Sequence, residues 1–409
     1  MISSSRAASL LLATLAAAAM SGCGSRSPTP EARPLVILVS IDGFGAEYFG
    51  RLRAPNLEAL ARSGVRARSL RPVFPVKTFP NHYTIATGLY PARHGIVSNN
   101  FVDPTTGVRF RISDTAAVLR GELWGGEPLW VTAERQGRRA ASYFWPGSDV
   151  AIGGALPSIW KRYDGTVPNA DRVDSVLAWL ALPAGQRPDL ITLYFSEVDS
   201  RAHDDGPWSP AAAAAVLHVD SMIGRLVGGI RRLGLEQTVN LIVVSDHGMI
   251  ATSPDSVVVL DDYLDTALVT QFDLGPLIQL EPRGISADSV LRALRRAPHL
   301  RLFHRDSTPT HWRYRGNARV AAVVGIPDEG WLFTTRRWLH RARFGGEHGY
   351  DPASPAMGAL FIASGPAFRR GVVVEPFTNI HVYELVCRVL GLRPAPNDGS
   401  LDSVVGMLR

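Results

Sequence analysis

Short apolar runs alternate along this chain with longer segments in which apolar residues recur at the spacing of a helix. Continuous apolar runs are typical of strands buried on both faces of a parallel sheet, and the helical spacing is typical of helices packed on that sheet. Strands are predicted near Leu35–Ile41, Ala140–Phe144, Leu190–Phe195, Leu241–Ser245 and Ala359–Ala363. Helices are predicted at Pro55–Ser63, Gly126–Gln136, Ala170–Ala181, Pro210–Leu233 and His381–Leu390. This alternation predicts an α/β fold with a mainly parallel central sheet and helices on both faces.

A region in the second half of the chain departs from this alternation. Shorter strand-like and helical segments follow one another there, at 278–280, 286–297, 312–314, 320–324 and 331–334. We interpret residues from about 255 to about 345 as a small α+β insert within one large domain over residues 34–409. The return of the chain from this insert would bring His348 back to the main sheet.

The composition supports one large core. The 409 residues are 46% hydrophobic, enough to bury a sizeable core, and 20% charged, which argues against disorder away from the ends. The net charge is +6 and comes mostly from arginine, and solvated helix faces and ion pairs account for most such clusters. Since the sequence has no internal repeat and no Gly-rich nucleotide loop, nucleic-acid binding is disfavoured and no nucleic-acid partner is expected.

The first residues have the pattern of a targeting segment. Arg6 precedes the apolar stretch Ala8–Met20, which is too short to span a bilayer, and the tetrapeptide Met-Ser-Gly-Cys ending at Cys23 resembles a bacterial lipobox. We expect a lipoprotein signal peptide over residues 1–22, lipidation of Cys23 and a flexible tether over residues 23–33. The alternative is a plain signal peptide with an incidental cysteine. Both predict an exported protein of the periplasm or cell envelope, and the first predicts membrane anchoring through the lipid.

Acidic residues and histidines follow several predicted strands. Because the carboxyl ends of parallel strands meet at one edge of a sheet, we expect these side chains to lie close together. Carboxylate oxygens and imidazole nitrogens are the ligands that zinc binds in catalytic sites. The candidate ligands are Asp42, Asp199, His203, Asp246, His247 and His348.

The spacing within two of these groups suits metal binding. Asp199 and His203 lie one helical turn apart, so both side chains can face one ion if the chain becomes helical after its strand. Asp246 and His247 are adjacent, which suits a strand end where the chain bends around Gly248. Alone, an Asp after a strand is usually a turn former, so the inference depends on the combination.

A threonine lies between Lys77 and Phe79, in a segment without a preceding apolar run. Two metal ions about 4 Å apart can activate a nucleophile, bind the leaving oxygen and stabilise the charge on a phosphoryl group. Thr78 is therefore a candidate nucleophile whose hydroxyl is deprotonated by coordination to zinc, and no separate general base is required. Hydrolysis of a phosphate ester is the first hypothesis for this set of residues.

Three neighbouring segments carry a resemblance to a known family. Their sequences are KTFPNHYT (77–84), TGLYP (87–91) and HGIVSNN (94–100). Together with the candidate ligands, which occur in the family's order, they resemble the nucleotide pyrophosphatase/phosphodiesterase family of the alkaline phosphatase superfamily. The similarity runs from about Val36 to about Gly365 and implies a hydrolase with an alkaline-phosphatase-like fold.

The resemblance implies a role for each candidate residue. The first implied zinc ion would be bound by Asp42, Asp246 and His247, together with Thr78. The second would be bound by Asp199, His203 and His348. Asn99 would donate a hydrogen bond to a non-bridging phosphate oxygen. Attack by Thr78 would give a covalent threonine intermediate, which water then hydrolyses. His82 and His94 have no comparable partners and are expected to brace the nucleophile segment.

The resemblance also implies a nucleotide pocket lined by aromatic residues. Its expected substrate-binding residues are Lys77, Phe79, Trp145, Pro146, Asp149, Tyr163 and Tyr194. Aromatic faces stack on a base with roughly 1–3 kcal/mol each and little discrimination between bases, so a broad preference among nucleotides is expected.

The leading expectation is a zinc-dependent phosphodiesterase and nucleotide pyrophosphatase that releases nucleoside 5′-monophosphates. Where many family members carry Glu-Glu-Pro-Asp, this chain has Ser-Glu-Val-Asp at 196–199, a difference that concerns substrate preference and not metal binding. The alternatives on the same two-zinc site are a choline or lysophospholipid phosphodiesterase and a phosphomonoesterase. A non-catalytic binding lipoprotein is disfavoured because the nucleophile and all the expected metal ligands are present.

Overall fold

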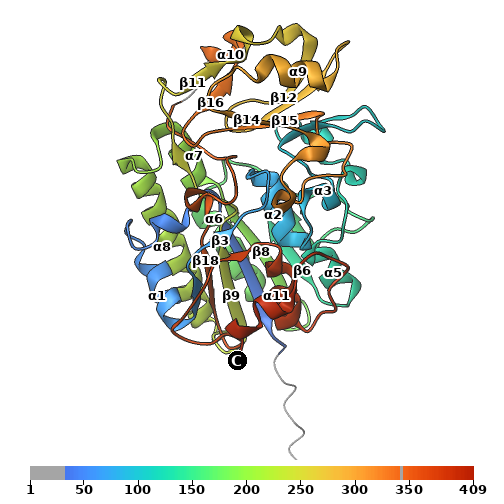
Figure 1. Ribbon diagram of the computed structural model, residues 1–409. Helices are drawn as coiled ribbons and strands as arrows, with labels where there is room; N and C mark the ends of the chain where they lie inside the picture. Colours follow the sequence, from blue (N-terminus) through green and yellow to red (C-terminus); the bar gives the residue numbers. More distant parts are fainter. Residues whose placement is uncertain (1–32, 341–343) are drawn as a thin grey trace, which may run out of the picture. The chain divides into compact units, whose positions relative to one another are not determined.

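The computed structural model describes residues 33–340 and 344–409. The predicted signal peptide, the lipidation site at Cys23 and the tether up to residue 32 lie outside the described residues. Residues 33–409 form one compact unit, whose helices and strands are shown in Figure 1.

The main sheet contains eight strands. They are β1 (Leu35–Ile41), β2 (Val65–Ala67), β6 (Ala140–Tyr143), β7 (Ile159–Lys161), β8 (Leu190–Phe195), β9 (Val239–Val244), β18 (Phe361–Ser364) and β19 (Val372–Val374). Their order across the sheet is β19-β2-β18-β9-β1-β8-β6-β7, and only β18 runs antiparallel to its neighbours within it. Every residue of β1, β8 and β9 is buried, which is why each strand is apolar except for one residue, Ser40, Thr192 and Asn240 respectively. The predicted α/β fold with a mainly parallel sheet is confirmed.

Helices cover both faces of this sheet (Figure 1). One group is α1 (Pro55–Ser63), α6 (Asn169–Leu180) and α8 (Pro210–Arg232), and the other is α2 (Thr78–Thr87), α5 (Leu129–Arg135) and α11 (His381–Leu390). Successive residues of β1 point to opposite faces of the sheet. Ile37 packs in one apolar cluster with the first group of helices, and Val36 packs in another with the second group. α8 is long and apolar enough to cross a membrane by length and composition, yet residues such as Val219 and Ile223 pack in the first cluster.

Several element ends differ from the predicted ones by one to three residues, and two of these differences have a clear local reason. α5 begins at Leu129 and not near Gly126, because Pro128 caps it and the residue before a proline disfavours helical backbone. β6 ends at Tyr143, because the next residue, Phe144, has a φ of 69°, in the left-handed region that a strand excludes.

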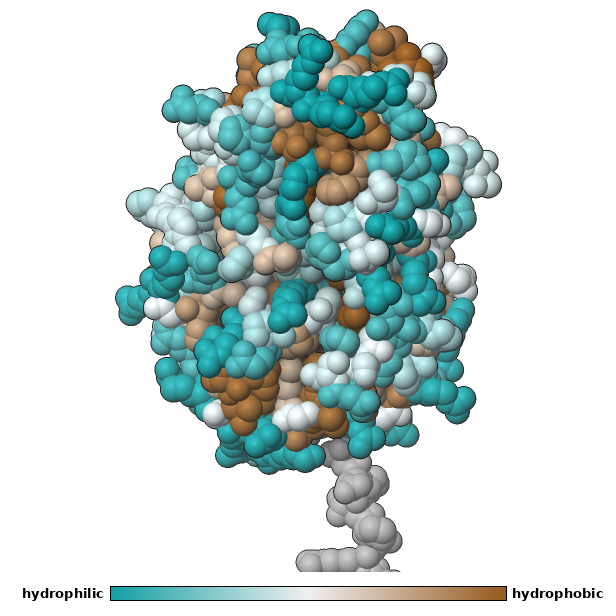
Figure 2. Space-filling model, viewed as in Figure 1, coloured by the Kyte–Doolittle hydropathy of each residue, from teal (hydrophilic) through white to brown (hydrophobic). Residues whose placement is uncertain are grey.

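A second sheet, antiparallel throughout, forms from residues of the predicted insert region. In order across this sheet, its four strands are β12 (Val269–Asp273), β13 (Ile278–Pro282), β15 (Val323–Pro327) and β14 (Leu300–His304). Helix α9 (Ala287–Leu294) packs on it and shares its apolar cluster. Apolar residues also gather at the surface over β14 and β15 (Figure 2). Strands β11 (Val257–Val259) and β16 (Leu332–Thr334) form a separate parallel pair.

The segment at 312–314 is part of the main core and not of the small sheet. Trp312 ends the short helix η6 (Thr310–Trp312) and stacks on Phe74, with ring centroids 3.9 Å apart. The hydroxyl of Tyr314 donates to the carbonyl of Val97 at 2.7 Å. Residues of the predicted insert region therefore share packing with the main core.

The chain returns from the small sheet to the main sheet through a short antiparallel pair. Strand β17 (Gly346–Glu347) pairs with β10 (Ile250–Ala251), which lies shortly after the end of β9. His348 is therefore brought to the carboxyl end of the main sheet. The other described strands and α-helices are α3 (Pro91–His94), α4 (Thr115–Val118), α7 (Glu197–Asp205), α10 (Arg336–Leu339), β3 (Leu70–Arg71), β4 (Asn100–Val102), β5 (Arg109–Arg111) and β20 (Phe377–Thr378).

Candidate functional site

The structure brings the predicted metal ligands together at the carboxyl ends of β1, β8 and β9. These strands are neighbours, so the residues that follow them meet. Asp42 follows β1 and Asp246 follows β9. After β8 the chain turns into α7, which carries Asp199 and His203 one turn apart. His348 arrives directly after β17.

Asp42, Asp246 and His247 form one group of possible ligands, with ligand atoms within 4.8 Å of one another. The Nε2 atom of His247 lies 2.9 Å from Oδ2 of Asp246 and 3.5 Å from Oδ1 of Asp42. The turn after Asp42 requires a glycine, because Gly43 has a φ of 68° and a Cβ there would lie 2.8 Å from the Cα of Asp199. This close approach of two backbones brings the first group beside the remaining ligands.

Asp199, His203 and His348 lie next to this first group. The Oδ1 atom of Asp199 is 3.4 Å from Nε2 of His203 and 3.9 Å from Nε2 of His348. The rings of His247 and His348 stack with centroids 3.5 Å apart, and ligand atoms of His247, Asp199 and His348 also lie within 4.8 Å of one another. The two groups are therefore contiguous, with His247 between them.

The backbone holds all three histidines in the same tautomer. In each ring, Nδ1 lies 2.8–3.0 Å from a carbonyl oxygen, which can only accept a hydrogen bond. Nδ1 therefore carries the proton and Nε2 presents its lone pair, as in most metal-ligating histidines. The pairs are His203 with Gly346, His247 with Gly248 and His348 with Val76.

Several buried acceptor atoms of this cluster have no hydrogen-bond partner among the described residues. They are Oδ1 of Asp42, Oδ1 of Asp199, Oδ2 of Asp246 and Nε2 of His247. Lone pairs that face one another at these distances repel, and a buried acceptor left unsatisfied is costly. A bound cation would satisfy all of them, and carboxylates with neutral imidazoles are a donor set that fits zinc. The cluster is a candidate metal site.

The electrostatics of the cluster lead to the same conclusion. Burial raises the pKa of Asp42 well above its ordinary value, and the nearby carboxylates of Asp246 and Asp199 raise it further. Burial also lowers the pKa of His348 well below its ordinary value, helped by His247. Buried carboxylates crowded in this way favour a divalent cation, which compensates their mutual repulsion.

Thr78 is the first residue of α2 and lines the same pocket as Asp42. Nδ1 of His82 lies 2.9 Å from the Thr78 carbonyl oxygen, so the predicted bracing of the nucleophile segment by His82 is confirmed. The Phe79 N–H donates to Oδ1 of Asn99 at 3.1 Å. This contact orients the amide of Asn99 and leaves its Nδ2 hydrogens for another acceptor.

Lys77 lies in a different place from the one expected for a substrate-binding residue. Its buried Nζ donates to the carbonyl of His348 at 2.9 Å, and Lys77 is not among the described residues that line the pocket beside Thr78. Lys77 therefore holds the segment that carries His348.

The pocket beside Thr78, which we call the Thr78 pocket, has a volume of about 330 Å³. Its lining includes the other predicted substrate-binding residues, Phe79, Trp145, Pro146, Asp149, Tyr163 and Tyr194. Tyr163 is 54% exposed and offers an open aromatic face. Tyr194 is buried and donates its hydroxyl to Oδ2 of Asp42 at 2.6 Å, and buried Trp145 donates to the carbonyl of His82 at 3.1 Å. These two aromatics support the metal ligands and the nucleophile segment.

Several other residues that line the Thr78 pocket were not predicted from the sequence. Examples are Ile112, Thr115, Val118, Lys161 and Arg162. The first three come from the end of β5 and from α4, and no local pattern places these elements at the pocket. Phe144 has a positive φ, of 69°. The centre of its ring lies 5.0 Å from the guanidinium carbon of buried Arg172. Such a strained aromatic residue is typical of a functional site, but its backbone angle is invisible in sequence.

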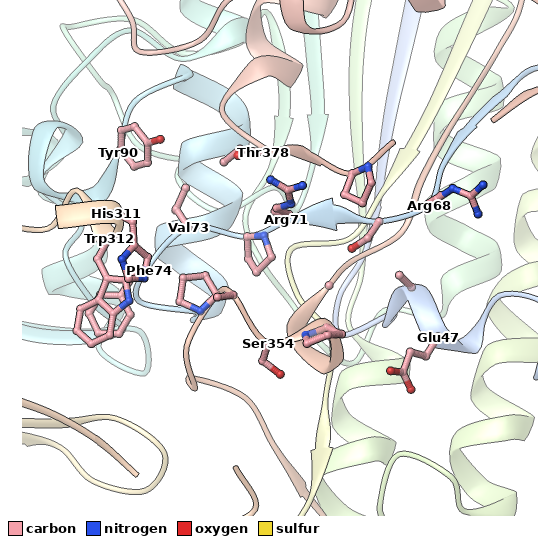
Figure 3. Close-up of a pocket in the computed structure, with 18 residues that line it drawn as sticks. Glu47, Arg68, Arg71, Val73, Phe74, Tyr90, His311, Trp312, Ser354 and Thr378 are labelled. Atoms are coloured by element: carbon pink, nitrogen blue, oxygen red, sulfur yellow. The ribbon is translucent and has the colours of Figure 1, made fainter. Parts of the chain in front are cut away.

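A larger cavity, of about 730 Å³, lies elsewhere in this unit. Its lining includes Arg71, Tyr90, His311 and Ser354 (Figure 3). None of the predicted ligands or pocket residues lines it. The candidate chemistry therefore belongs to the smaller Thr78 pocket.

Comparison with known proteins gives consistent matches. A family model described as type I phosphodiesterase / nucleotide pyrophosphatase matches residues 36–351. Ectonucleotide pyrophosphatase/phosphodiesterase family member 3 of Rattus norvegicus is 38% identical over 389 residues, which cover 92% of this chain and 44% of that protein. A venom phosphodiesterase of Crotalus durissus collilineatus is 39% identical over 391 residues, 93% of this chain and 47% of that protein. The chain thus spans less than half the length of these relatives.

Solved structures show the same likeness. Murine ectonucleotide pyrophosphatase/phosphodiesterase 5 aligns with a TM-score of 0.88 at 34% identity, covering 92% of this chain and 100% of that one. An inactive threonine-to-alanine variant of the murine protein in complex with AMP aligns with a TM-score of 0.88 at 33% identity, over 92% of this chain and 100% of that one. These likenesses confirm the predicted fold class.

Proposed function

The chain belongs to the type I phosphodiesterase/nucleotide pyrophosphatase family, and from this membership we propose that it hydrolyses phosphodiester or pyrophosphate bonds of nucleotides and releases nucleoside 5′-monophosphates. One observation carries the proposal: the unsatisfied ligand atoms of the metal cluster lie beside Thr78 at a pocket with an open aromatic face. The AMP complex of the inactive murine relative, whose altered residue is a threonine, supports the choice of ligand and nucleophile.

We propose that the cluster holds two Zn²⁺ ions. One ion would be held by Asp42, Asp246 and His247, beside Thr78. The other would be held by Asp199, His203 and His348. Bound zinc would supply positive charge that lowers the pKa of a hydroxyl and stabilises phosphoryl oxygens. Mixed nitrogen and oxygen donors favour zinc over magnesium, which prefers oxygen ligands.

Thr78 is the nucleophile in this proposal. Its Oγ1 loses its proton and forms a bond to phosphorus while the bond from phosphorus to the leaving oxygen breaks. The leaving oxygen departs with that electron pair and takes up a proton from water, and the nucleotidyl group remains on Thr78 as an ester. Asn99 directs its Nδ2 hydrogens at a non-bridging oxygen, and the N-terminus of α2 adds partial positive charge. Water then attacks the same phosphorus, which releases the nucleoside 5′-monophosphate and restores the Thr78 hydroxyl.

The lining of the Thr78 pocket favours a nucleotide over a choline ester. Lys161 and Arg162 line the pocket, and a quaternary ammonium group would meet these cations. Away from the metal cluster, Asp149 is the one carboxylate among the described lining residues. A nucleobase can instead stack on Tyr163 without electrostatic cost.

Three chromogenic substrates test this function. Purified protein would be assayed, with zinc and with chelator, on p-nitrophenyl thymidine 5′-monophosphate, p-nitrophenyl phosphate and p-nitrophenyl phosphorylcholine. Dominant, zinc-dependent cleavage of the nucleotide ester is the expected result. Preference for the choline ester or the monoester would overturn the nucleotide assignment while keeping the metal site, and failure to cleave any of them would overturn the function.

We also propose that residues 34–409 are the catalytic domain, with an insert at about 255–345, of an exported lipoprotein anchored through Cys23. The sequence features of residues 1–33 support this arrangement. Radiolabelled palmitate should label the full-length protein but not Cys23→Ser. Equal labelling of both would contradict the anchor.

A further inference from the structure

The residues that precede the parallel strands form the end of the main sheet opposite the metal cluster, which we call the amino end. Arg33 lies two residues before β1, and the N–H of Val36 donates at 2.8 Å to the carbonyl of Asp189, which directly precedes β8. The N–H of Asp189 donates in turn at 2.8 Å to the carbonyl of Arg139, which directly precedes β6. Since β1 has seven residues, the amino end lies roughly 23 Å from the end at which Asp42 joins the cluster.

Two later segments bring further arginines to the amino end. β18 is antiparallel to β9, so the residues after it lie there, and the N–H of Ala367 donates at 2.8 Å to Asn240, near the start of β9. Arg370 follows in this segment. Arg393 follows α11, and its N–H donates at 2.9 Å to Gln136, between α5 and β6. With Arg187, three residues before β8, we call these residues the amino-end arginines: Arg33, Arg139, Arg187, Arg370 and Arg393.

The side chains of the amino-end arginines form no ion pair and no hydrogen bond within residues 33–340 and 344–409. Asp189 pairs instead with Arg138, at 2.9 Å. Glu236, shortly before β9, pairs with Arg231 at 3.3 Å. Arg187 is half-buried, and its buried Nε has no hydrogen-bond partner among the described residues. Unpaired guanidinium groups keep their fork of N–H donors for an external ligand, and this fork matches the oxygens of a phosphate group.

Exposed apolar side chains lie at the same end. Val405 begins the short helix η9 (Val405–Met407), and the carbonyl of Met407 accepts at 2.9 Å from the N–H of Arg369, the residue before Arg370. Figure 1 shows the C-terminus at this end of the sheet, near β9 and α11. Leu233 ends α8 shortly before β9. Val405 and Leu233 are both exposed, and apolar side chains among arginines suit the boundary between lipid head groups and acyl chains.

We propose that the amino end of the sheet is a membrane-contact surface, on which the amino-end arginines bind the phosphate head groups of anionic phospholipids. The inference rests on the proposed lipidation of Cys23. Arg33 lies ten positions after Cys23, and ten extended residues reach at most about 35 Å, so the anchor keeps this end of the domain near the bilayer. Lipid and positive charge then act as two membrane-binding signals, because anionic head groups attract cations within a Debye length.

This contact orients the catalytic site. The metal cluster lies at the carboxyl ends of β1, β8 and β9, and the amino-end arginines lie at the opposite ends of the same sheet. Binding of the arginines to a bilayer therefore points the Thr78 pocket away from the membrane. A substrate reaches the cluster from water and not from the bilayer, which agrees with a nucleotide and not with a lysophospholipid.

Chemical modification of arginines on vesicles tests this surface. Full-length lipidated protein would be inserted into vesicles of phosphatidylcholine, alone or with about one-third phosphatidylglycerol. Phenylglyoxal would modify exposed arginines, and mass spectrometry would follow the rate at each position. Arg139, Arg370 and Arg393 should react at least about five-fold more slowly on the anionic vesicles, and about 0.5 M salt should remove this difference. Arg292, at an exposed position of α9, should react equally on both.

A charge-reversal variant tests whether positive charge is responsible. In Arg370→Glu/Arg393→Glu, Arg139 should react on anionic vesicles as fast as on neutral ones. Arg295→Glu/Arg296→Glu, at exposed positions at the end of α9, is the matched control and should keep the protection of Arg139. Both variants should cleave p-nitrophenyl thymidine 5′-monophosphate at the original rate, because neither pair lies at the metal cluster or the Thr78 pocket. This activity also shows that the variants are folded.

The outcomes distinguish this inference from the lipid anchor on which it depends. Equal reaction rates on neutral and anionic vesicles would overturn the membrane-contact surface and leave the anchor in place. Protection of Arg139 that survives the charge reversal would overturn it as well. If dissolved heparin protects the same arginines on neutral vesicles as strongly as phosphatidylglycerol does, the surface binds an anionic polysaccharide and the membrane proposal is wrong. If the unaltered protein takes up no palmitate, the anchor falls and this inference with it.

Discussion

Asp273 accepts a hydrogen bond of 2.6 Å from the hydroxyl of Ser98. Its other carboxylate oxygen accepts a longer bond, of 3.3 Å, from Nδ2 of Asn100. Ser98 and Asn100 flank Asn99, so a buried carboxylate at the end of β12 holds the chain on both sides of the proposed phosphate-binding residue. The small sheet therefore helps to position Asn99.

Replacement of this carboxylate should impair catalysis more than substrate binding. In Asp273→Asn one acceptor oxygen becomes a donor, so the hydrogen bonds that Ser98, Asn100 and Gln279 donate to this carboxylate cannot all be kept. We expect kcat on p-nitrophenyl thymidine 5′-monophosphate to fall by roughly ten-fold, with KM changed by less than about two-fold in steady-state assays. Asp288→Asn, at an exposed position of α9, is the control. A higher KM with unchanged kcat would contradict a positioning role for Asp273.

Thr78→Ala should abolish turnover without releasing metal. The variant lacks the proposed nucleophile, while every carboxylate and imidazole of the cluster remains. We expect kcat below about one-thousandth of the original value, with zinc content unchanged by mass spectrometry. Thr78→Ser keeps a hydroxyl and should retain measurable turnover. Full activity in Thr78→Ala would exclude the covalent mechanism.

His348→Ala should release one of the two proposed zinc ions. Its Nε2 lies 3.9 Å from Oδ1 of Asp199, and its loss would leave that ion with too few protein ligands for tight binding. Metal analysis should show one ion per chain, and turnover should be lost with it. His311→Ala, at an exposed position, should keep both ions. Two ions in purified His348→Ala would show that the second ligand set is wrong.

β1, α1 and α11 have the bounds that the hydrophobic pattern predicts. β1 is apolar except for Ser40, Pro55 is the first residue of α1, and Gly391, with a φ of 69°, ends α11 in the left-handed conformation. The metal cluster was predictable for a related reason. Asp42 and Asp246 each follow a buried strand, and parallel strands deliver such residues to one edge of the sheet.

Sequence patterns do not show which distant side chains meet. The hydroxyl of Tyr194 donates to Asp42, and the ammonium of Lys77 donates to the carbonyl of His348, across 152 and 271 positions of sequence. Both contacts depend on how remote segments pack. A local sequence pattern indicates only which residues are buried and whether their spacing is that of a strand or a helix. The antiparallel direction of β18 is not visible in a local pattern either, because it depends on the path of the long connection that precedes this strand. The cavity of about 540 Å³ that residues of β5, β12, β16 and α10 line could not be inferred for the same reason.

Tyr163→Ala should weaken nucleotide substrates selectively. The exposed ring of Tyr163 is the proposed stacking surface for the base, and its loss should remove roughly 1–3 kcal/mol of binding. This corresponds to a fall of roughly five-fold to 150-fold in kcat/KM for p-nitrophenyl thymidine 5′-monophosphate. Bis(p-nitrophenyl) phosphate has no base and should be cleaved almost as before, and Tyr163→Phe should retain both activities. Equal losses on both substrates in Tyr163→Ala would argue against stacking at this position.

The pH dependence of stability should reveal the buried ring of His94. Its Nδ1 accepts from the N–H of Ile96 at 3.2 Å, and its Nε2 bonds the hydroxyl of Thr84 in α2 at 3.0 Å, so the predicted bracing is confirmed. Burial lowers the pKa of His94 to about 3, whereas an unfolded histidine has a pKa of about 6.5. Between these values the unfolded chain binds more protons. The free energy of unfolding should therefore fall as the pH falls, by up to about 1.4 kcal/mol per pH unit.

His94→Gln removes this titration while keeping a hydrogen-bond donor for Thr84. Urea unfolding of metal-free protein, from about pH 7.5 to about pH 4.5, gives the free energy of unfolding at each pH. His381 also has a pKa lowered by burial, but it is present in both proteins and cancels in their comparison. Above about pH 6.5 the two curves should be parallel, because His94 is neutral in both the folded and the unfolded chain. Below this pH the curve of the variant should fall less steeply, so that the two converge. Curves that stay parallel throughout would mean that His94 does not remain neutral in the folded protein, and its assignment as a buried brace of α2 would have to be abandoned.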